Sequence, residues 1–514
     1  MKPLKRTDGA GIGMMIVVLL FILVRLPTAL LSPGGQDEEW YGIPGLTIAN
    51  EGIPRVPYAR ATDPDSVFIG ADEMLFAQPP LSFYAQAPFF EIFAGNYGTA
   101  RLSSLVAAIV SIVLTFGIAE AFFQDRRLAI LAAAIYSCSR LCFFPAMVAR
   151  PDMLCGMLGL LAVYCGAISR QQYQTRWIIA AGISVGLAAL SHPFAIVFGI
   201  QMTIWIAWNA ENLIGIVRRV AVFAISVTAT FATWTPLILM RPDLFRSQFV
   251  GNILRPAGPG LLSRFVMPWD SFSHQTPQLI DRAHPIQFSM LLFGLIAISF
   301  LAWNKRDRAA TTITVLGISS VYLLTACLGD HPVQGFWCYS ASLGWIAFAY
   351  VARQFDIAVI RGRANKTSLR TFAAAILLAA MLPGSGGRAV MTYATKFGDD
   401  VYASPRFVRN ILDDLPADAT LTVGPEFSLP AYAAGRDVIL ACRHPMYFDS
   451  AEIPTDYYIF GRRDFAEDMV AAYACELVRN YGNHDDVFAN YAEVYRRSPE
   501  ATAAPATASA SASP

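Results

Sequence analysis

Long apolar runs recur along the chain and limit its fold more than any other feature. A helix of about 20 apolar residues is long enough to cross the hydrocarbon core of a bilayer, and this chain is 55% hydrophobic with only 15% charged residues. The candidate spans are residues 11–31, 97–123, 128–146, 151–168, 177–191, 193–210, 220–240, 285–303, 309–328, 333–352 and 371–386. We therefore predict a polytopic α-helical membrane protein with about 11 or more spanning helices.

The apolar runs divide the chain into three parts. Residues 1–386 form the predicted transmembrane domain, residues 387–500 a small C-terminal domain, and residues 501–514 a disordered tail of Ala, Ser, Pro and Thr. The runs 177–191 and 193–210 are short, so a re-entrant hairpin is the alternative to two spans there.

The distribution of basic residues predicts the orientation. With a cytoplasmic N-terminus, the segments on the inner side hold 17 Lys and Arg residues, whereas the short outer turns hold only Arg150. Short loops rich in Lys and Arg stay in the cytoplasm. We therefore expect residues 32–96, 241–284 and the chain after about 387 to be extracytoplasmic, in a plasma (inner) membrane protein.

The predicted C-terminal domain is of the α/β type. Short β-rich runs at 420–423, 438–441 and 457–460 alternate with helical stretches, one of which repeats an apolar residue every four positions from Phe465 to Leu477. The domain contains no GxGxxG motif and no P-loop, so its sequence does not indicate nucleotide chemistry.

Three consecutive acids, Asp37, Glu38 and Glu39, follow the first span at the start of a long loop. This loop, residues 32–96, holds nine acidic and two basic residues and is too long for a simple connection. Its aromatic part, residues 74–95, is expected to form interfacial helices. On composition alone, a solvated acidic patch is the favoured interpretation of the three acids. The functional alternative is that one carboxylate serves as a general base for a hydroxyl group at the membrane surface.

Asp152 is a second candidate acid, at the start of the span 151–168. An ionisable residue beside an apolar helix is costly unless it is paired or exposed to water, which makes it a candidate site residue. The alternative is an acid stabilised by the helix dipole after Pro151, with Arg150 contacting lipid headgroups. Asp37 and Asp152 are expected to emerge on the same side at a similar depth, as one active site would require.

The order of these features resembles a known family. The N-terminal anchor, the acids Asp37 and Glu38 followed by Tyr41, the segment QPPLSFYAQAPFFEIFAGNYGTARLSSLV at 78–106, and ARPDM at 149–153 are similar to the GT-C glycosyltransferases. The nearest branch contains the dolichyl-phosphate-mannose protein mannosyltransferases and the lipid A aminoarabinose transferase. Recognisable motifs cover about residues 11–170, and beyond them the resemblance rests on architecture.

The resemblance implies transfer of a sugar from a polyprenyl-phosphate donor to an acceptor at the outer face of the membrane, usually with inversion. A lipid phosphate is a competent leaving group, so no general acid is needed, in contrast to a glycosidase with its two carboxylates. The implied partners are the donor, a lipid, glycan or protein acceptor, and membrane lipids, with no nucleic acid among them.

Two residues carry the implied catalysis. By position, Asp37 matches the family's first-loop acid and is implied as the base or acceptor-orienting carboxylate. Asp152 matches the second outer acid, which positions groups or binds a metal where a member uses one. We expect Glu38 to be a second-rank helper and Glu39 to be solvated. The implied substrate-binding residues are Glu38, Tyr41, Gln78, Arg150, Arg101 and His331.

The chain departs from the family pattern at two positions, and both departures remove positive charge. Gln78 stands where the aminoarabinose branch commonly has Lys, and Trp40 stands where that branch often has Arg. The cations that could compensate are Arg150, Arg101, Arg60 and Arg255, of which Arg150 is best placed because it adjoins Asp152.

The sequence predicts no cofactor with certainty. No cluster of His, Asp and Cys is dense enough to indicate a dedicated metal site, and a divalent metal is the open alternative. His331 could contact a phosphate or a metal, although a lone interfacial His is more often structural.

Two other classes of protein compete with the glycosyltransferase hypothesis. A secondary transporter would have two halves with repeated hydropathy and broken helices at the midplane, and no such repeat is visible. A non-catalytic membrane subunit with a partner-binding outer domain would tolerate the loss of Asp37.

Overall fold

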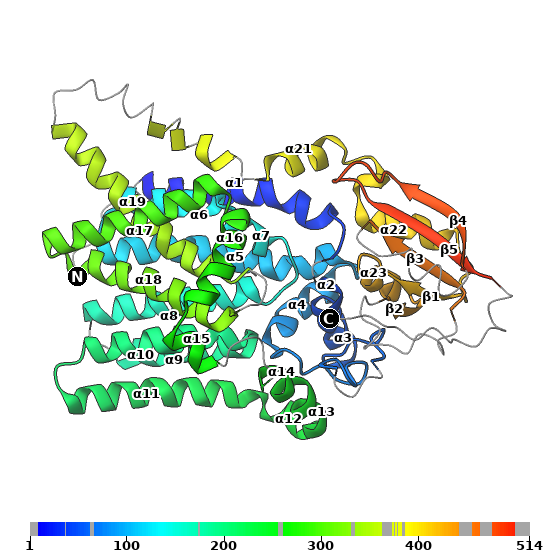
Figure 1. The fold of residues 1–514 in the computed structure, drawn as a ribbon, viewed down its shortest axis with the longest axis horizontal. Helices are drawn as coiled ribbons and strands as arrows, with labels where there is room; N and C mark the ends of the chain where they lie inside the picture. The colour runs from blue at the N-terminus through cyan, green and yellow to red at the C-terminus, as the bar shows by residue number, and fades with distance from the viewer. Residues whose placement is uncertain are drawn as a thin grey trace.

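A bundle of long helices carries a small β-sheet at one end (Figure 1). The structure is a computed structural model. It describes residues 9–35, 37–61, 66–172, 175–254, 261–329, 335–361, 373–374, 376–377, 379–382, 386–441, 455–462 and 475–498. We call the end of the bundle that carries the sheet the sheet end, and residues 32–96 the first loop.

The bundle is built mainly from long apolar helices, most of which run in similar directions in Figure 1. They are α1 (Gly9–Leu31), α5 (Tyr97–Phe123), α6 (Arg126–Cys138), α7 (Arg140–Ala146), α8 (Asp152–Gln172), α9 (Thr175–Ser191), α10 (Ile196–Trp208), α11 (Leu213–Phe231), α17 (Pro285–Lys305), α18 (Arg308–Leu328) and α19 (Trp337–Arg361). Five further α-helices follow α11 in the chain before α17, namely α12 (Thr235–Met240), α13 (Pro242–Leu244), α14 (Gly251–Leu254), α15 (Leu261–Val266) and α16 (Trp269–Ala283).

Fewer helices than the eleven predicted spans satisfy a length and hydropathy criterion. Within the described residues, six helices are long and apolar enough to cross a membrane, or seven if α6 and α7, which are bent by 58°, form one span. The helices α9 and α10 are apolar but shorter. The predicted span 371–386 lies largely outside the described residues, so the count of eleven stays a prediction.

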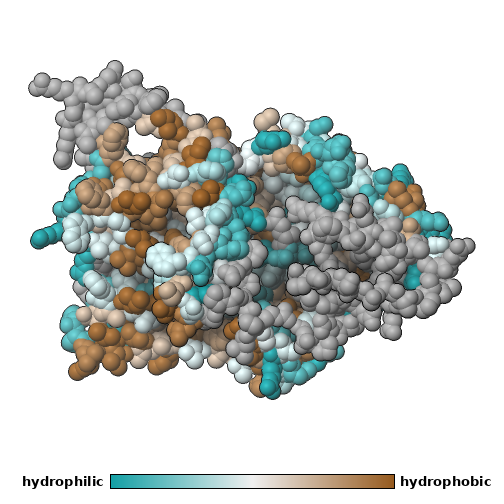
Figure 2. Space-filling view, in the orientation of Figure 1, coloured by the Kyte–Doolittle hydropathy of each residue, from teal (hydrophilic) through white to brown (hydrophobic). Residues whose placement is uncertain are grey.

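The helix α11 lies at the edge of the bundle and packs on α9 through two glycines. A Cβ added at Gly182 would lie 2.7 Å from the Phe223 carbonyl oxygen, and one at Gly186 would lie 2.8 Å from that of Val227. Small residues four apart permit such close helix packing in membranes. Only 6% of the most apolar stretch of Leu213–Met240 is buried. Hydrophobic residues also cover much of the bundle surface in Figure 2. This surface suits a lipid environment.

Five strands form a mixed sheet in the order β2-β1-β3-β5-β4. They are β1 (Thr420–Val423), β2 (Asp437–Leu440), β3 (Tyr457–Gly461), β4 (Cys475–Gly482) and β5 (Tyr491–Arg497). The strand β1 pairs in parallel with β2 and β3, and the pairs β3–β5 and β4–β5 are antiparallel. The helices α21 (Gly387–Thr395), α22 (Ser404–Asp413) and α23 (Ser428–Ala433) belong to the same region.

The three predicted strands are confirmed by β1, β2 and β3, whereas the predicted helix that ends at Leu477 is wrong at that residue. Leu477 lies in β4, where it is paired with Tyr495. Pairing with β5 overrides the apparent four-residue period, because a ladder partner satisfies the backbone that a helix would otherwise satisfy internally. The other residues of that predicted helix lie outside the described part of the chain, except Cys475 and Glu476, which also belong to β4.

The first loop and the sheet region share one hydrophobic core. The first loop contains α2 (Glu38–Tyr41), α3 (Ile43–Glu51) and α4 (Leu81–Ile92). Its side chains Trp40, Tyr58 and Phe83 belong to the same buried cluster as Phe407 and Phe427 of the C-terminal region. The two segments predicted as separate units are thus held together, and the sheet fixes the position of the first loop.

Polar contacts join the same two segments. The Leu440 amide donates to the Tyr58 carbonyl at 3.0 Å. Directly after the first loop, at the start of α5, the Tyr97 hydroxyl lies 2.9 Å from that of Ser428. In α4, Phe83 faces the shared core while Ile92 is exposed. The location of α4 in a membrane interface stays a prediction from the sequence.

Candidate active site

Asp37 occupies a strained turn at the start of α2. Its φ of 68° lies in the left-handed region, which costs energy for a residue with a Cβ, although Asp tolerates it better than most. Such outliers gather at functional sites, where the surrounding structure holds them in place. The Asp37 side chain is 50% exposed, so one carboxylate oxygen can meet a ligand.

Arg150 connects the two acids that the sequence singles out. Its Nη1 donates to Asp37 Oδ2, and its Nε donates to Asp152 Oδ2 at 2.9 Å. Arg150 is 7% exposed and Asp152 1% exposed. Two acids 115 positions apart in the sequence therefore contact one guanidinium, which is the proximity that a single site requires.

Asp152 lies in the first turn of α8. Gly335, which precedes α19, packs against its side chain. A Cβ added at Gly335 would lie 3.0 Å from Asp152 Cγ. The Oδ1 atom of Asp152 has no hydrogen-bond partner among the residues that the structure describes. A buried oxygen without a partner is costly, and here it leaves an acceptor available beside Arg150.

The described residues contain no group of three or more His, Cys, Asp and Glu that could hold a metal ion. The two acids contact a guanidinium, whose positive charge disfavours a cation between them. The divalent metal named as an alternative from the sequence stays untested.

Tyr41 and Gln78 complete the cluster around Arg150. The Arg150 guanidinium carbon lies 5.3 Å from the centroid of the Tyr41 ring, within the range of a cation–π contact. Burial raises the pKa of the Tyr41 hydroxyl to about 12, and the nearby Arg150 charge opposes that rise. Tyr41 therefore stays a hydrogen-bond donor at neutral pH, and Gln78, which hydrogen-bonds it, has a buried Oε1 with no partner among the described residues.

Glu38 and Arg101 form a separate buried pair beside this cluster. Arg101 Nε donates to Glu38 Oε1 at 2.7 Å, and Nη2 donates to Oε2. Arg101 also donates to the carbonyls of Ala29, Ser32 and Pro33. The Ala149 amide, one residue before Arg150, donates to Glu38 Oε1 at 2.7 Å.

This pair positions both acid-bearing segments at once. Glu38 lies next to Asp37, and its contact with Ala149 ties the first loop to the segment that carries Arg150 and Asp152. Arg101, which lies in α5 of the bundle, holds the Glu38 carboxylate in place. We infer that Glu38 and Arg101 act through Asp37 and Arg150 as positioning residues.

One expectation about the first loop is wrong, and one departure from the family pattern has a structural role. Glu39, expected to be solvated, is 7% exposed, because its neighbours in α2 pack into the core that the first loop shares with the sheet region. Trp40, which stands where a positive charge might be expected, is a core residue that stacks on Phe68 with ring centroids 3.9 Å apart. Burial raises the pKa of the Glu39 carboxyl to about 8.

The raised pKa of Glu39 predicts a pH-dependent stability. In the folded protein the Glu39 pKa of about 8 lies above its ordinary value of 4.5. Between these two pH values the folded protein keeps a proton on Glu39 that the unfolded chain has lost. The stabilisation is complete below about pH 4.5 and is lost as the pH rises through about 8. We expect the Tm of the wild type to fall between pH 5 and 8, and a Glu39→Gln variant to lack that part of the fall. Glu91→Gln, at an exposed position of α4, is the matched control. If both variants reduce the fall of the Tm equally, Glu39 is not its cause.

Two of the predicted cations, Arg60 and Arg255, and the candidate site residue His331 do not join the cluster or cannot be placed. Arg60 is about half exposed and lies 3.4 Å from Asp437. His331 and Arg255 lie outside the described residues.

Gln248 is a positioning residue that the sequence does not reveal. It is fully buried and lies in a π-helical turn, Phe245–Val250. Its Oε1 accepts from the amides of Phe76 and Ala77, at 2.6 and 3.1 Å, directly before Gln78. No local pattern marks a lone Gln in a predicted outer loop as the anchor of a segment about 170 residues earlier.

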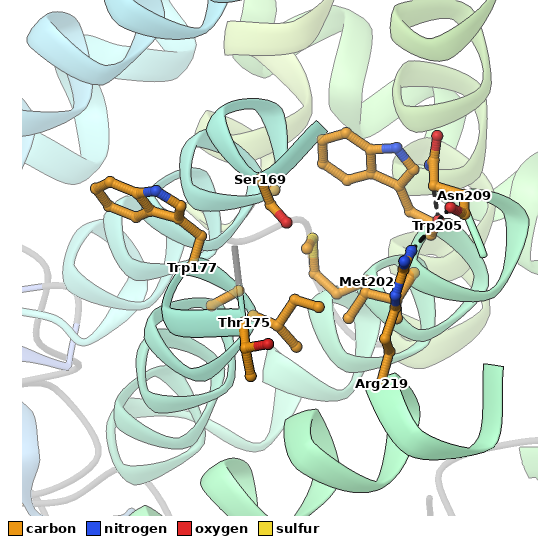
Figure 3. A pocket seen from close by; sticks show the side chains of 11 residues that line it. Ser169, Thr175, Trp177, Met202, Trp205, Asn209 and Arg219 are labelled. Carbon is orange, nitrogen blue, oxygen red and sulfur yellow. Dashed lines mark hydrogen bonds between the residues drawn. The ribbon is translucent and has the colours of Figure 1, made fainter. Parts of the chain in front are cut away.

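A small pocket at the opposite end of the bundle is unsuited to the same chemistry. It lies between α8, α9, α10 and α11 and has a volume of about 60 Å³ (Figure 3). Among its described lining residues only Arg219 is ionisable, and its Nη1 donates to the Asn209 carbonyl at 3.0 Å. The described lining therefore offers no carboxylate that could act as a base.

One family model matches part of the chain. Residues 77–238 match the model of the dolichyl-phosphate-mannose-protein mannosyltransferase family. The matched stretch begins just before Gln78 and includes Arg101, Arg150 and Asp152. No curated protein sequence matches the chain.

The fold is similar to those of several solved structures. ArnT from Cupriavidus metallidurans bound to undecaprenyl phosphate is 13% identical, with a TM-score of 0.61 over 95% of this chain and 98% of that one. Its apo state gives 12% identity and a TM-score of 0.59, over 94% and 98%. The oligosaccharyltransferase AglB from Archaeoglobus fulgidus, in complex with an inhibitory peptide and a dolichol-phosphate, is 12% identical, with a TM-score of 0.51 over 97% and 75%.

These likenesses show the fold, which is of the GT-C type found in ArnT and AglB. The match of residues 77–238 to the mannosyltransferase family model agrees with that fold.

Proposed function

We propose that the chain is a glycosyltransferase that moves a sugar from a polyprenyl-phosphate-linked donor to an acceptor at the outer face of the membrane, with inversion. The observation that carries the proposal is the cluster at the sheet end, where half-exposed Asp37 and buried Asp152 contact one arginine, Arg150. The solved relatives bound to undecaprenyl phosphate and dolichol-phosphate support a lipid-linked donor.

In the proposed reaction Asp37 acts as the base. It takes a proton from an acceptor hydroxyl while the acceptor oxygen forms a bond to the anomeric carbon of the sugar. The bond between that carbon and the phosphate oxygen breaks, and the polyprenyl phosphate leaves with the electron pair. One positioned carboxylate is enough, because the phosphate leaves without protonation.

Arg150 and Asp152 support this step in different ways. Positive charge near the departing phosphate stabilises the negative charge that develops there, and Arg150 is the cation closest to Asp37 among the described contacts. Asp152 holds the Arg150 guanidinium from the buried side. Tyr41 and Gln78 add hydrogen-bonding groups that take the place of the absent Lys.

An apolar cavity offers space for the polyprenyl chain. It has a volume of about 260 Å³ and lies among α7, α16, α17, α18 and α19. Leucine and phenylalanine side chains dominate its lining, and Trp337 stands at its wall. An apolar chain gains free energy when it leaves water for such a surface.

The same proposal includes the orientation. The sheet end is extracytoplasmic and the N-terminus cytoplasmic, in the plasma (inner) membrane. The support is the excess of Lys and Arg in the segments at the other end.

Turnover of defined donors by the purified protein in lipid vesicles tests the proposal. Polyprenyl-phosphate mannose, glucose and arabinose are supplied in turn, and release of labelled sugar is measured. We expect at least one of these donors to be consumed, and GDP-mannose to be left intact. Consumption of the nucleotide sugar alone, or of no donor, would refute the proposed activity.

A further inference from the structure

A second cavity lies beside the turn that carries Asp37. Its volume is about 310 Å³, within the range of about 300–1,000 Å³ that is typical of small-molecule sites. Gly34, Gly35 and Glu38 line it, and Asp37 lies between them in the sequence. Val148, two residues before Arg150, forms part of another wall. The two segments that bear the acids and Arg150 thus also bound this cavity.

The C-terminal region closes the cavity from the other side. Tyr393 of α21, Glu426 and Arg462 contribute polar groups, and Phe488 and Tyr491 contribute aromatic rings. The sheet region therefore completes a binding space that the bundle and the first loop leave open. This gives the C-terminal region a specific part in the site.

The charged groups of the lining balance each other. Two acids, Glu38 and Glu426, stand with two arginines, Arg101 and Arg462. Both Glu38 and Arg101 are at most 2% exposed and already paired. The cavity therefore has no net formal charge from these four groups, and it suits a neutral polar ligand better than an anion.

Two polar groups at the cavity lack partners. Thr28 is 6% exposed, and its Oγ1 has no hydrogen-bond partner among the residues that the structure describes. The Nε atom of Arg462 likewise has no hydrogen-bond partner among those residues. Burial raises the pKa of the Tyr393 hydroxyl to about 12, so it stays a donor. Buried polar groups without partners are rare, and here they would be satisfied by a hydroxyl-bearing ligand.

Aromatic side chains form the remaining walls. They are Phe143 and Phe144 from the bundle and Phe488 and Tyr491 from the C-terminal region. The guanidinium carbon of Arg25 in α1 lies 4.0 Å from the centroid of the Phe143 ring. A buried arginine in an apolar helix usually marks function, and Arg25 here supports an aromatic wall of the cavity.

We infer that this cavity binds the acceptor, and that the acceptor end is a sugar unit of a glycan or glycolipid. The inference rests on the proposed glycosyltransferase function. Sugar hydroxyls both donate to carboxylates and accept from guanidinium and hydroxyl groups, while the C–H faces of the ring pack on aromatic side chains. The paired charges, the unpartnered Thr28 and Arg462 groups and the aromatic walls match that chemistry.

The test removes two hydroxyls from the cavity without changing its shape. In a Thr28→Val/Tyr393→Phe double variant, we expect binding of methyl α-mannoside or methyl α-glucoside, measured by saturation-transfer NMR without donor, to weaken about tenfold or more. Each lost hydrogen bond costs about 0.5–1.5 kcal/mol, or about 2- to 13-fold. With the donor that the wild type consumes, the ratio of glycoside product to free sugar should fall by a similar factor.

A matched control makes the same chemical changes away from the cavity. Thr395→Val/Tyr481→Phe should leave glycoside binding and the product ratio at the wild-type values. Unchanged binding in the cavity variant, no binding of either glycoside by the wild type, or preferred transfer to acetyl-Ala-Thr-Ala-amide would overturn the inference. If the wild type consumes no donor but binds a glycoside, and the cavity variant loses that binding, the proposed activity fails and the sugar-binding cavity stands.

Discussion

Replacing Asp37 with Asn is expected to lower the rate constant of sugar transfer by about 10²- to 10⁴-fold, which is the usual contribution of a general base. Asn keeps the size of the side chain and can still contact Arg150, but it cannot accept the acceptor proton. The Michaelis constant for the donor should change little, because the loss falls on a proton transfer that occurs in the transition state. The measurement is steady-state transfer in vesicles that contain the donor consumed by the wild type.

The matched control is Glu91→Gln in the same first loop, where the side chain is exposed on α4. It should retain wild-type transfer. If Asp37→Asn keeps more than half of the wild-type rate constant, Asp37 is not the base.

Replacing Arg101 with Met is expected to destabilise the protein by about 3–5 kcal/mol, the cost of leaving one charge of a buried ion pair without its partner. Glu38 is 1% exposed, so water cannot compensate its carboxylate. The variant also leaves the carbonyls of Ala29, Ser32 and Pro33 without their donor. The free energy of unfolding in detergent micelles, measured with a denaturant, gives the size of the effect.

A second substitution separates the lost charge from the lost packing. Glu38→Leu combined with Arg101→Met should recover part of the stability, because no lone charge then stays buried. The control is Arg60→Met, since the Arg60–Asp437 pair is about half exposed and such pairs contribute little. Equal, small losses in Arg101→Met and Arg60→Met would contradict the positioning role of the buried pair.

Local patterns were sufficient for the elements whose formation depends on local sequence. Apolar runs predicted the helices α1, α5, α8, α17 and α18, and β-branched runs predicted β1, β2 and β3. The acids after the first span and the ARPDM segment indicated that Asp37 and Asp152 lie close together. The shared contact with Arg150 follows from helix packing that no short pattern contains.

The remaining features depend on contacts between distant segments. Glu39 was expected in solvent because three adjacent acids are usually solvated, but it is buried, next to Trp40, which packs in one core with the distant residues Phe407 and Phe427. Gln248 anchors the segment before Gln78 through four hydrogen bonds to backbone groups, and its sequence neighbours carry no sign of that role. Leu477 follows a helical period but lies in a strand because β5 is its partner.

The anomeric configuration of the product tests the central claim most directly. A single displacement with Asp37 as the base attacks the sugar from the face opposite the phosphate, so the product must have the opposite configuration to the donor. The anomeric coupling constant of the purified product, measured by NMR for a donor of known configuration, decides the question. We predict complete inversion by the wild-type protein, and retention of configuration would contradict a mechanism with one base.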